Sequence, residues 1–323
     1  MLDDERIVCL FPGQGSQHVG MGADLYRRYP QARRRFDQAD KLLGYKLSRL
    51  CFKGPVDVLN SDLNAQLAVY TVSCILADLL KQAHMVPEAV TGYSSGYYAA
   101  AYAAGGLSFE QGLAIVKLAG EILLDEGRHI DGKMAVIFGL PHNDVAAICT
   151  HTGDVDMAIV NTTQQAIVSG LAPAVQQVIT RCLAAGALDA YLLPAETAYH
   201  SRFMETARKR LADAIPMAHM SDPQIPIMSY ATLEMATVKK DLAQTMAAQL
   251  TCTVRWCDLL RELGAKGDRQ ILETGPGAVI SRAARWVDRR MAVTAIGSAE
   301  ALGRVVGNRL QRKRSCPKQS TAI

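Results

Sequence analysis

The sequence predicts an α/β protein in which a small domain is inserted into a larger one, and three observations lead to this fold class. Short apolar runs that end in glycine or proline alternate with long segments of helical periodicity. Between residues 131 and 195 the order changes to strand, helix, two strands, helix and strand. After residue 195 helical and α/β patterns resume, which indicates that the middle segment interrupts the larger domain.

The first part of the large domain begins with a buried strand. The apolar run at 7–11 ends at Pro12 and Gly13, which favour a turn. Residues 65–85 are apolar almost all round and predict a central helix. The stretch AVTGYSSG at 89–96 then predicts a short strand that breaks into a serine turn.

Two helices are expected after this turn, and one more strand, helix and strand near the end. The alanine-rich stretch at 97–106 is typical of a helix packed closely against its neighbours, with a glycine C-cap. Ser108 is in N-cap position before a segment with apolar spacing close to 3.6 residues. Residues 269–280 predict a strand, a tight turn and a helix, and 291–298 a last strand.

The middle segment has the order and size of a ferredoxin-like domain. Its expected strands are 132–140, 155–162, 164–171 and 188–194, and its expected helices are 141–153 and 173–186. The predicted boundaries are therefore a discontinuous large domain at 1–130 and 196–305, an inserted domain at 131–195 and a basic tail at 306–323. Because the tail lacks apolar periodicity, we expect it to be flexible.

The composition is that of a globular protein without extended disorder. Of the 323 residues, 49% are hydrophobic and 20% are charged, which allows a substantial core. No apolar run approaches the length of a membrane span, and the apolar run at the N-terminus is too short for a signal peptide, so we expect a cytoplasmic protein without a membrane partner.

The same composition argues against several classes of site. The eight cysteines form no CxxC pair and lie mostly in apolar stretches, so neither disulfides nor a structural metal is expected. The net charge of +4 comes in good part from the tail, and no basic face interleaved with aromatics indicates a nucleic-acid partner.

Gly92 and Gly96 bracket Ser94 in the pattern G-x-S-x-G. After a strand and before a helix, this pattern holds a serine on a sharp turn with its hydroxyl exposed. An ordinary glycine-rich turn is the alternative interpretation. The order of strand, turn and helix favours a nucleophile in an α/β-hydrolase-like domain, which makes Ser94 the candidate.

A serine nucleophile needs a base and oxyanion donors. Among seven histidines, His200 follows the last expected strand of the small domain, at a junction where clefts form. As a base it would lose function on protonation, and we expect its pKa to be ordinary, roughly 6–7. The turn at 11–17 could supply the backbone N–H of Gln14 as an oxyanion donor, and the residue after the nucleophile, Ser95, the other.

Six stretches resemble, in order, the malonyl-CoA:acyl carrier protein transacylase family. They are FPGQGSQHVGMG at 11–22, GYSSG at 92–96, GGLSFEQGLAIVKLAG at 105–120, NTTQQAIVSG at 161–170, AYHSRFM at 198–204 and ETGPGAVI at 273–280. The similarity covers about residues 5–300. Each motif is weak alone, and the set is specific.

The resemblance implies a fold and a ping-pong reaction. The fold is an α/β-hydrolase-like domain with an inserted ferredoxin-like one. Ser94 would take an acyl group from coenzyme A and pass it to the phosphopantetheine thiol of an acyl carrier protein, with His200 as base and acid. Gln14 and Ser95 match the oxyanion donors, and Gln249 matches a glutamine that helps place the histidine and nucleophile. No permanently bound cofactor and no metal are implied.

Departures from the family pattern fall on the acyl pocket. Tyr93 and Tyr97 replace a histidine and a glutamate around the nucleophile, and Tyr199 replaces a phenylalanine before His200. Ala119 aligns with the arginine that grips the malonyl carboxylate. Malonyl is the acyl group that the resemblance implies by default. Since a bidentate arginine selects carboxylated acyl groups by charge and shape, its loss instead favours an acetyl or longer uncarboxylated acyl group.

Two other functions remain open at this stage. An editing hydrolase that removes acyl groups from carrier proteins would keep Ser94 and His200 and also needs no carboxylate grip. A non-catalytic docking subunit would hold a carrier protein within a synthase, although such a scaffold has no use for a nucleophile and a base.

Overall fold

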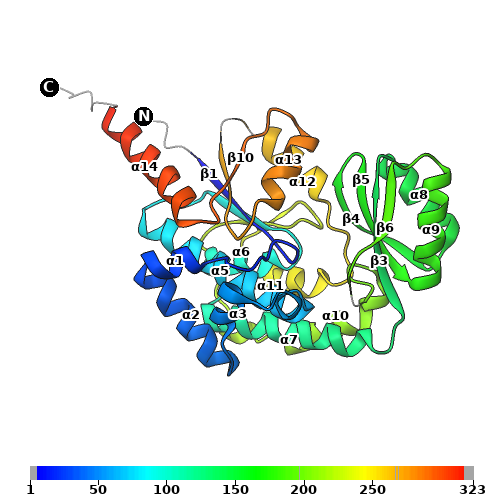
Figure 1. Cartoon of the computed structure of the whole chain (residues 1–323), viewed down its shortest axis with the longest axis horizontal. Coiled ribbons are helices and arrows are strands. Elements are labelled where there is room, and N and C mark those ends of the chain that lie inside the picture. Colours follow the sequence, from blue (N-terminus) through cyan, green and yellow to red (C-terminus); the bar gives the residue numbers. More distant parts are fainter. Residues whose placement is uncertain (1–5, 196, 266, 268, 316–323) are drawn as a thin grey trace.

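The computed structural model describes residues 6–315 except 196, 266 and 268, and these residues form two α/β units, each built on its own sheet (Figure 1). The expected fold class, a large α/β domain with a small one, is confirmed. All elements of the small unit lie between Gly132 and Leu192, within the predicted 131–195. The boundary residues themselves stay a prediction.

The larger sheet has six strands in the order β10-β9-β1-β2-β7-β8. They are β1 (Ile7–Phe11), β2 (Ala89–Gly92), β7 (Ile227–Met228), β8 (Met235–Ala236), β9 (Gln270–Glu273) and β10 (Val293–Ala295). Neighbours pair in parallel except β7 and β8. β1 lies between two parallel partners and is buried along its whole length, as its unbroken apolar sequence requires.

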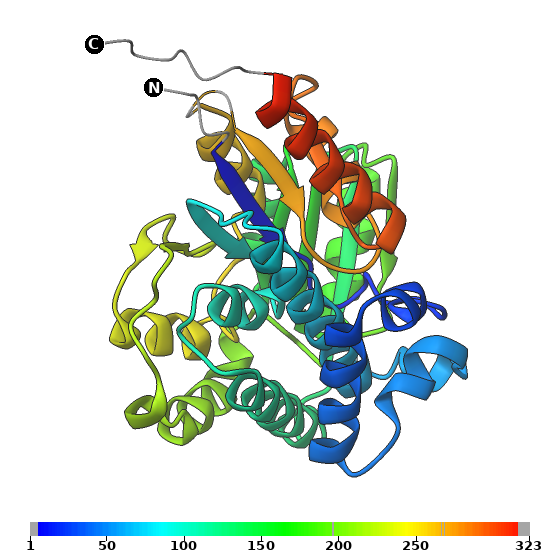
Figure 2. The same ribbon diagram turned by 90° about the vertical axis from the view of Figure 1, so that its left-hand side faces the viewer.

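Helices cover both faces of this sheet, as Figure 2 shows. Those before the small unit are α1 (Ala23–Arg28), α2 (Pro30–Leu43), α3 (Leu47–Lys53), α4 (Val56–Leu59), α5 (Asp62–Gln82), α6 (Gly96–Ala103) and α7 (Phe109–Gly127). Those after it are α10 (Glu205–Ala214), α11 (Lys239–Ala248), α12 (Trp256–Ala265), α13 (Val279–Val287) and α14 (Ala299–Ser315), with short 3-10 turns at Arg202–Met204 and Met217–His219.

The central helix expected at 65–85 is α5, which begins and ends three residues earlier. It is apolar almost all round because it is buried among α2, α6 and α7. Its length and composition alone would allow it to cross a membrane, so the expectation that no apolar run reaches that length was wrong. In this fold 78% of the most apolar 18-residue stretch of the helix is buried inside the protein, as in a core helix.

Helix α7 begins where the sequence predicted. The Ser108 hydroxyl accepts a hydrogen bond from the backbone N–H of Gln111, and the Gln111 side chain accepts one from the Ser108 backbone N–H. This reciprocal capping box satisfies two N–H groups that the first turn leaves unpaired. The helix then runs beneath the site described below.

The small unit is ferredoxin-like, as predicted. Its elements are β3 (Gly132–Phe138), α8 (His142–Thr152), β4 (Val155–Thr162), β5 (Gln165–Leu171), α9 (Ala172–Ala184) and β6 (Asp189–Leu192). The four strands lie in the order β4-β5-β3-β6 and pair antiparallel throughout. Helices α8 and α9 cover one face, and the other face turns toward the large unit.

The expected flexible tail was wrong for residues 306–315. These residues continue α14, which lies along the outer side of the large unit beside β10 (Figure 2). Leu302 and Val305 are buried and hold the helix to the protein, and arginine, leucine, lysine and glutamine beyond them are good helix formers. The last eight residues of the tail lie outside the described residues.

Main-chain hydrogen bonds join the two units. Val254, in the segment before α12, donates its N–H to the Ala158 carbonyl of β4 and accepts from the N–H of Val160, both at 2.9 Å. The edge strand of the small sheet is thereby fixed against the large unit. This fixed junction positions the cavity between them.

Candidate active site

Ser94 lies in the turn between β2 and α6. Its φ is +52°, a left-handed conformation that serine adopts only where the surroundings impose it. The turn is tight enough to require both flanking glycines. A Cβ on Gly92 would lie 2.1 Å from the Tyr97 backbone nitrogen, and one on Gly96 would lie 2.1 Å from the Phe11 carbonyl oxygen. The G-x-S-x-G pattern is therefore a nucleophile-type turn, as predicted.

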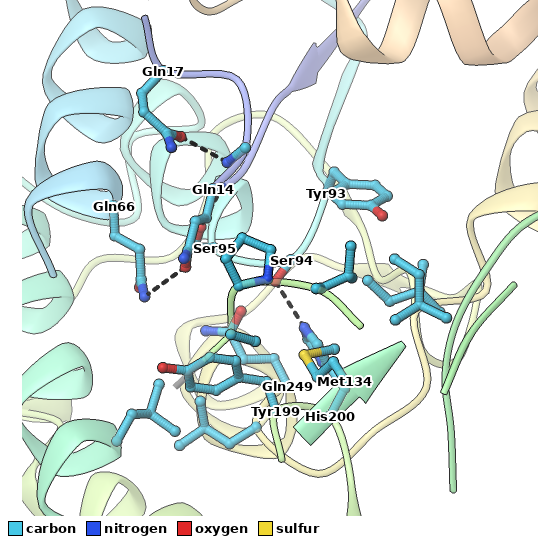
Figure 3. Close-up of a pocket in the computed structure, with 18 of the residues that line it drawn as sticks. Gln14, Gln17, Gln66, Tyr93, Ser94, Ser95, Met134, Tyr199, His200 and Gln249 are labelled. Carbon is cyan, nitrogen blue, oxygen red and sulfur yellow. Dashed lines mark hydrogen bonds between the residues drawn. The ribbon is translucent and has the colours of Figure 1, made fainter. Parts of the chain in front are cut away.

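His200 faces Ser94 across the junction of the two units (Figure 3). Its Nε2 lies 2.8 Å from Ser94 Oγ, and its Nδ1 lies 3.2 Å from the carbonyl oxygen of Cys252. Since a carbonyl can only accept, Nδ1 carries the hydrogen and Nε2 is left to accept from the serine hydroxyl. This is the tautomer that a general base needs.

The imidazole is held neutral by burial. His200 is 7% exposed, and desolvation lowers its pKa to about 4, although the carbonyls of Cys252 and Gln249 act in the opposite direction. The sequence-based expectation of an ordinary pKa was therefore wrong. His200 also has a positive φ of +58°, so both members of the pair sit on constrained backbone.

Gln249 approaches His200 through its main chain. Its side-chain Nε2 donates to the Met246 carbonyl at 3.0 Å, and its Oε1 accepts from the Tyr230 hydroxyl at 3.3 Å. Its backbone carbonyl is the part that acts on the imidazole. The orienting acceptor at 3.2 Å from Nδ1, the carbonyl of Cys252, had no signal in the sequence because any residue can present a carbonyl there.

The two expected oxyanion donors lie together beside Ser94. The Gln14 backbone N–H points to Ser95 and donates to its Oγ at 3.2 Å. Ser95 precedes the first residue of α6, where N–H groups of the first turn have no partner within the helix. The site therefore has two N–H groups from different elements next to the nucleophile, which the sequence predicted from two separate motifs.

A cavity of about 550 Å³ opens beside this pair, between the two units. The large unit contributes Gln14, Gly15, Gln17, Asn60, Gln66, Tyr93, Ser94, Ser95, Tyr98, Leu123, Gln249 and Leu250. The small unit and the segment after it contribute Met134, Ile159, Ile167, Leu193, Pro194, Ala195, Tyr199 and His200. Among these residues there is no lysine, arginine, aspartate or glutamate. The cavity is of a size that suits a small-molecule substrate.

The predicted acyl-selecting residues separate into two groups. Tyr93 and Tyr199 line the cavity, where the Tyr93 hydroxyl donates to Asn161 at 2.9 Å and the Tyr199 hydroxyl donates to Asp62. Tyr97 does not line it: its ring is buried in the core, edge-on to Tyr230. The expectation that Tyr97 contacts the acyl group is corrected, because its place in α6 turns it into the core.

Ala119 also lies behind the cavity wall. It is 1% exposed within α7, and Leu123, one turn further along the same helix, reaches the cavity. Two cations that follow in the chain, Arg128 and Lys133, do not line the cavity either. Nothing among the described lining residues replaces the positive charge that an arginine at 119 would bring.

Known proteins resemble this chain over almost its full length. Residues 8–313 match the acyl transferase domain family. A malonyl CoA-acyl carrier protein transacylase of Bacillus subtilis is 33% identical over 92% of this chain and 95% of its own length, and the polyketide biosynthesis transacylase PksC of the same organism is 33% identical over 85% and 94%.

A solved structure agrees with this likeness. The malonyl-transacylase that was determined in complex with a type II PKS acyl-carrier protein superposes with a TM-score of 0.89, at 27% identity over 94% of this chain and 99% of that one. The order of motifs, the two-unit fold and the serine and histidine at 2.8 Å are what the resemblance in the sequence led us to expect. The chain belongs to the acyl transferase domain family, among relatives that are malonyl-CoA:acyl carrier protein transacylases.

Proposed function

We propose that this protein is a cytoplasmic S-acyltransferase that moves an uncarboxylated acyl group, acetyl or longer, from coenzyme A to the phosphopantetheine thiol of an acyl carrier protein. The relatives act on malonyl-CoA and acyl carrier protein by name, and one of them was solved with its carrier bound. The acyl preference departs from those names. The observation that carries it is a cavity beside Ser94 without a cationic side chain among its described lining residues.

In the first half-reaction Ser94 Oγ attacks the thioester carbonyl of acyl-CoA while His200 Nε2 takes its proton. The oxyanion of the tetrahedral intermediate accepts from the N–H groups of Gln14 and Ser95, and the Gln14 N–H exchanges its long bond to Ser95 Oγ for this stronger one. The carbon–sulfur bond then breaks, and His200 returns the proton to the departing thiolate. Free coenzyme A leaves and an acyl ester remains on Ser94.

The second half-reaction runs the same steps with the carrier thiol. His200 Nε2 takes the thiol proton, the sulfur attacks the ester carbonyl, and Ser94 Oγ leaves with the proton that His200 returns. The carbonyl of Cys252 keeps the imidazole in one tautomer during both halves. The reaction needs neither a metal nor a resident cofactor, because acyl transfer between two thiols consumes no electrons and no water.

The selection of an uncarboxylated group follows from charge. A carboxylate moved from water into a dry pocket is stable only if it is paired and hydrogen-bonded. Losing a charge-assisted pair from a desolvated site costs about 2–5 kcal/mol, and each 1.36 kcal/mol is tenfold in rate. Without an arginine at position 119, the carboxylate of a malonyl group would therefore lack a cationic partner among the described residues that line the cavity.

The test is covalent loading of Ser94. Purified protein is mixed with acetyl-, butyryl- and malonyl-CoA at equal concentrations, and intact mass spectrometry reports which acyl adduct forms. We expect acetyl or butyryl adducts to match or exceed malonyl, and Ser94→Ala to form none. A preference for malonyl of about a thousandfold would overturn the proposed substrate. A second variant, Ala119→Arg, restores the arginine of the family and should shift the ratio of adducts toward malonyl at least tenfold.

Transfer is separated from hydrolysis by the fate of the adduct. We expect the acyl-serine ester to persist in buffer and to be discharged rapidly by a holo acyl carrier protein. The same carrier without its phosphopantetheine arm is the matched control, because it docks but offers no thiol. Rapid release of free acid without any carrier would instead show an editing hydrolase.

A further inference from the structure

A buried carboxylate lies directly behind the cavity wall. Asp62 is 3% exposed and accepts hydrogen bonds from two side chains that line the cavity. Its Oδ1 accepts from Gln14 Nε2, and its Oδ2 accepts from the Tyr199 hydroxyl. Asp62 thus stands one side chain away from the oxyanion turn on one side and from the residue before His200 on the other.

Asp62 lies at the N-terminal end of a long helix and has hydrogen-bond donors on both carboxylate oxygens. It is the first residue of the 21-residue helix α5, where the aligned peptide dipoles and unpaired N–H groups stabilise an anion. No lysine or arginine of the described residues forms an ion pair with Asp62. The neighbours of this carboxylate in the described structure are therefore hydrogen-bond donors and a helix N-terminus, not a cationic side chain.

The charge of this carboxylate acts on whatever enters the cavity. Two like charges repel much more strongly across a low-dielectric wall than in water. Gln14 and Tyr199 line the cavity beside Ser94, and each donates one hydrogen bond to Asp62, so these two side chains lie between the carboxylate and the cavity. Figure 3 shows Gln14 and Tyr199 near the nucleophile. A carboxylated acyl group would meet this field without any cation to offset it.

We propose that Asp62 is a specificity-determining residue that disfavours carboxylated acyl groups by charge repulsion. This proposal rests on the proposed acyl transfer at Ser94 and adds an active element of selection. The absence of an arginine at position 119 removes an attraction, and Asp62 adds a repulsion. Effective discrimination commonly combines both.

The decisive variant is Asp62→Asn, which keeps the shape and one acceptor oxygen and removes the charge. Acetyl-CoA and malonyl-CoA compete for Ser94, and intact mass spectrometry gives the ratio of the two adducts. We expect the malonyl-to-acetyl ratio to rise at least tenfold over the wild-type protein. Loading with acetyl also shows within the same experiment that the variant is folded.

Two further variants separate charge from structure. Asp57→Asn removes the same charge from an exposed position in α4 and should leave the ratio unchanged. Asp62→Glu changes the shape and keeps the carboxylate, so the ratio should not rise. If Asp62→Asn slows both acyl groups equally, Asp62 only positions the oxyanion turn, and the proposal is overturned.

The outcome for Asp62 is read independently of the outcome for the proposed function. The wild-type preference alone decides whether the protein favours an uncarboxylated acyl group. The change in ratio between wild-type and Asp62→Asn decides whether this carboxylate repels an anion. An unchanged ratio in a protein that prefers acetyl would overturn the role of Asp62 and leave the proposed function standing.

Discussion

At the residue scale, the proposed chemistry depends on a neutral His200 imidazole that carries its hydrogen on Nδ1. His200 obtains neutrality from burial and its tautomer from the Cys252 carbonyl, and no carboxylate contacts it in the described structure. A carboxylate partner would raise the pKa of the histidine, whereas a carbonyl orients the ring with much less effect. The site therefore combines an oriented base with a low pKa.

The pH dependence of loading follows from this low pKa. Since the neutral form is the base, acylation of Ser94 should stay nearly constant from pH 8 to about pH 5 and fall as the pH drops through about 4. The unfolded chain binds this proton near pH 6.5, so stability is also lost as the pH falls from about 6.5 toward 4.

Single-turnover loading with acetyl-CoA across pH 4–8 measures the profile, with circular dichroism at each pH to confirm folding. His151→Gln, at an exposed histidine, should leave the profile unchanged. A midpoint near 6.5 would mean that His200 is solvated in solution and that burial does not set its pKa.

At the element scale, the nucleophile is positioned by backbone packed against backbone. Gly96 opens α6 with its Cα against the carbonyls of Phe11 and Pro12, at the end of β1. The turn after β2 and the turn after β1 are thus held together where Ser94 and Gln14 must meet. No side chain can be accommodated at this contact without moving one of the two turns.

The corresponding variant is Gly96→Ala. Its Cβ would lie 2.1 Å from the Phe11 carbonyl oxygen, so we expect the free energy of unfolding to fall by at least about 1–3 kcal/mol. We also expect the rate of Ser94 acylation to fall by more than the fraction of unfolded protein explains. Chemical denaturation and adduct mass spectrometry measure the two effects.

Gly307→Ala is the matched control, since nothing lies within 4 Å of its added Cβ and its position is helical. It should raise stability by about 0.5–1 kcal/mol and leave loading unchanged. No gain from Gly307→Ala would contradict a stable α14 at residues 306–315. A fully active Gly96→Ala protein would contradict the tight contact between the turns.

At the scale of the whole molecule, the cavity beside Ser94 exists only because the two units meet. Ser94 and Ser95 come from the large unit, whereas Met134, Ile159 and Ile167 come from the sheet of the small one. Strand alternation places Met134 toward the cavity and Ile137 toward the helices on the other face. The small unit therefore contributes apolar side chains to one side of the cavity.

Shortening Met134 should enlarge this side. Met134→Ala is expected to shift loading from acetyl toward butyryl and hexanoyl groups by about tenfold, at a cost in stability of about 2–5 kcal/mol. Ile137→Ala, on the same strand and the opposite face, should cost similar stability without changing the acyl preference. Equal preferences in the two variants would show that the small unit does not contact the acyl chain.

The local sequence was enough to predict several structural elements of this protein. The strand at 7–11, the serine turn, the Ser108 cap and the βαββαβ order were all predictable because each depends on neighbours within a few residues. Ser94, Gln14 and Ser95 were predictable because tight turns need glycine, and glycine patterns are visible in a sequence. His200 was predictable as a candidate from its place at a domain junction.

Only the tertiary structure decided what surrounds these groups. Tyr97 and Ala119 were expected at the acyl group and lie behind the wall, because the direction of a helical side chain depends on how the helix is packed. The Cys252 carbonyl and Asp62 reach the site from segments 52 and 137 residues away from their partners, His200 and Tyr199. Charge, burial and pKa are properties of such long-range neighbours, and for that reason the nucleophile was visible in the sequence and its environment was not.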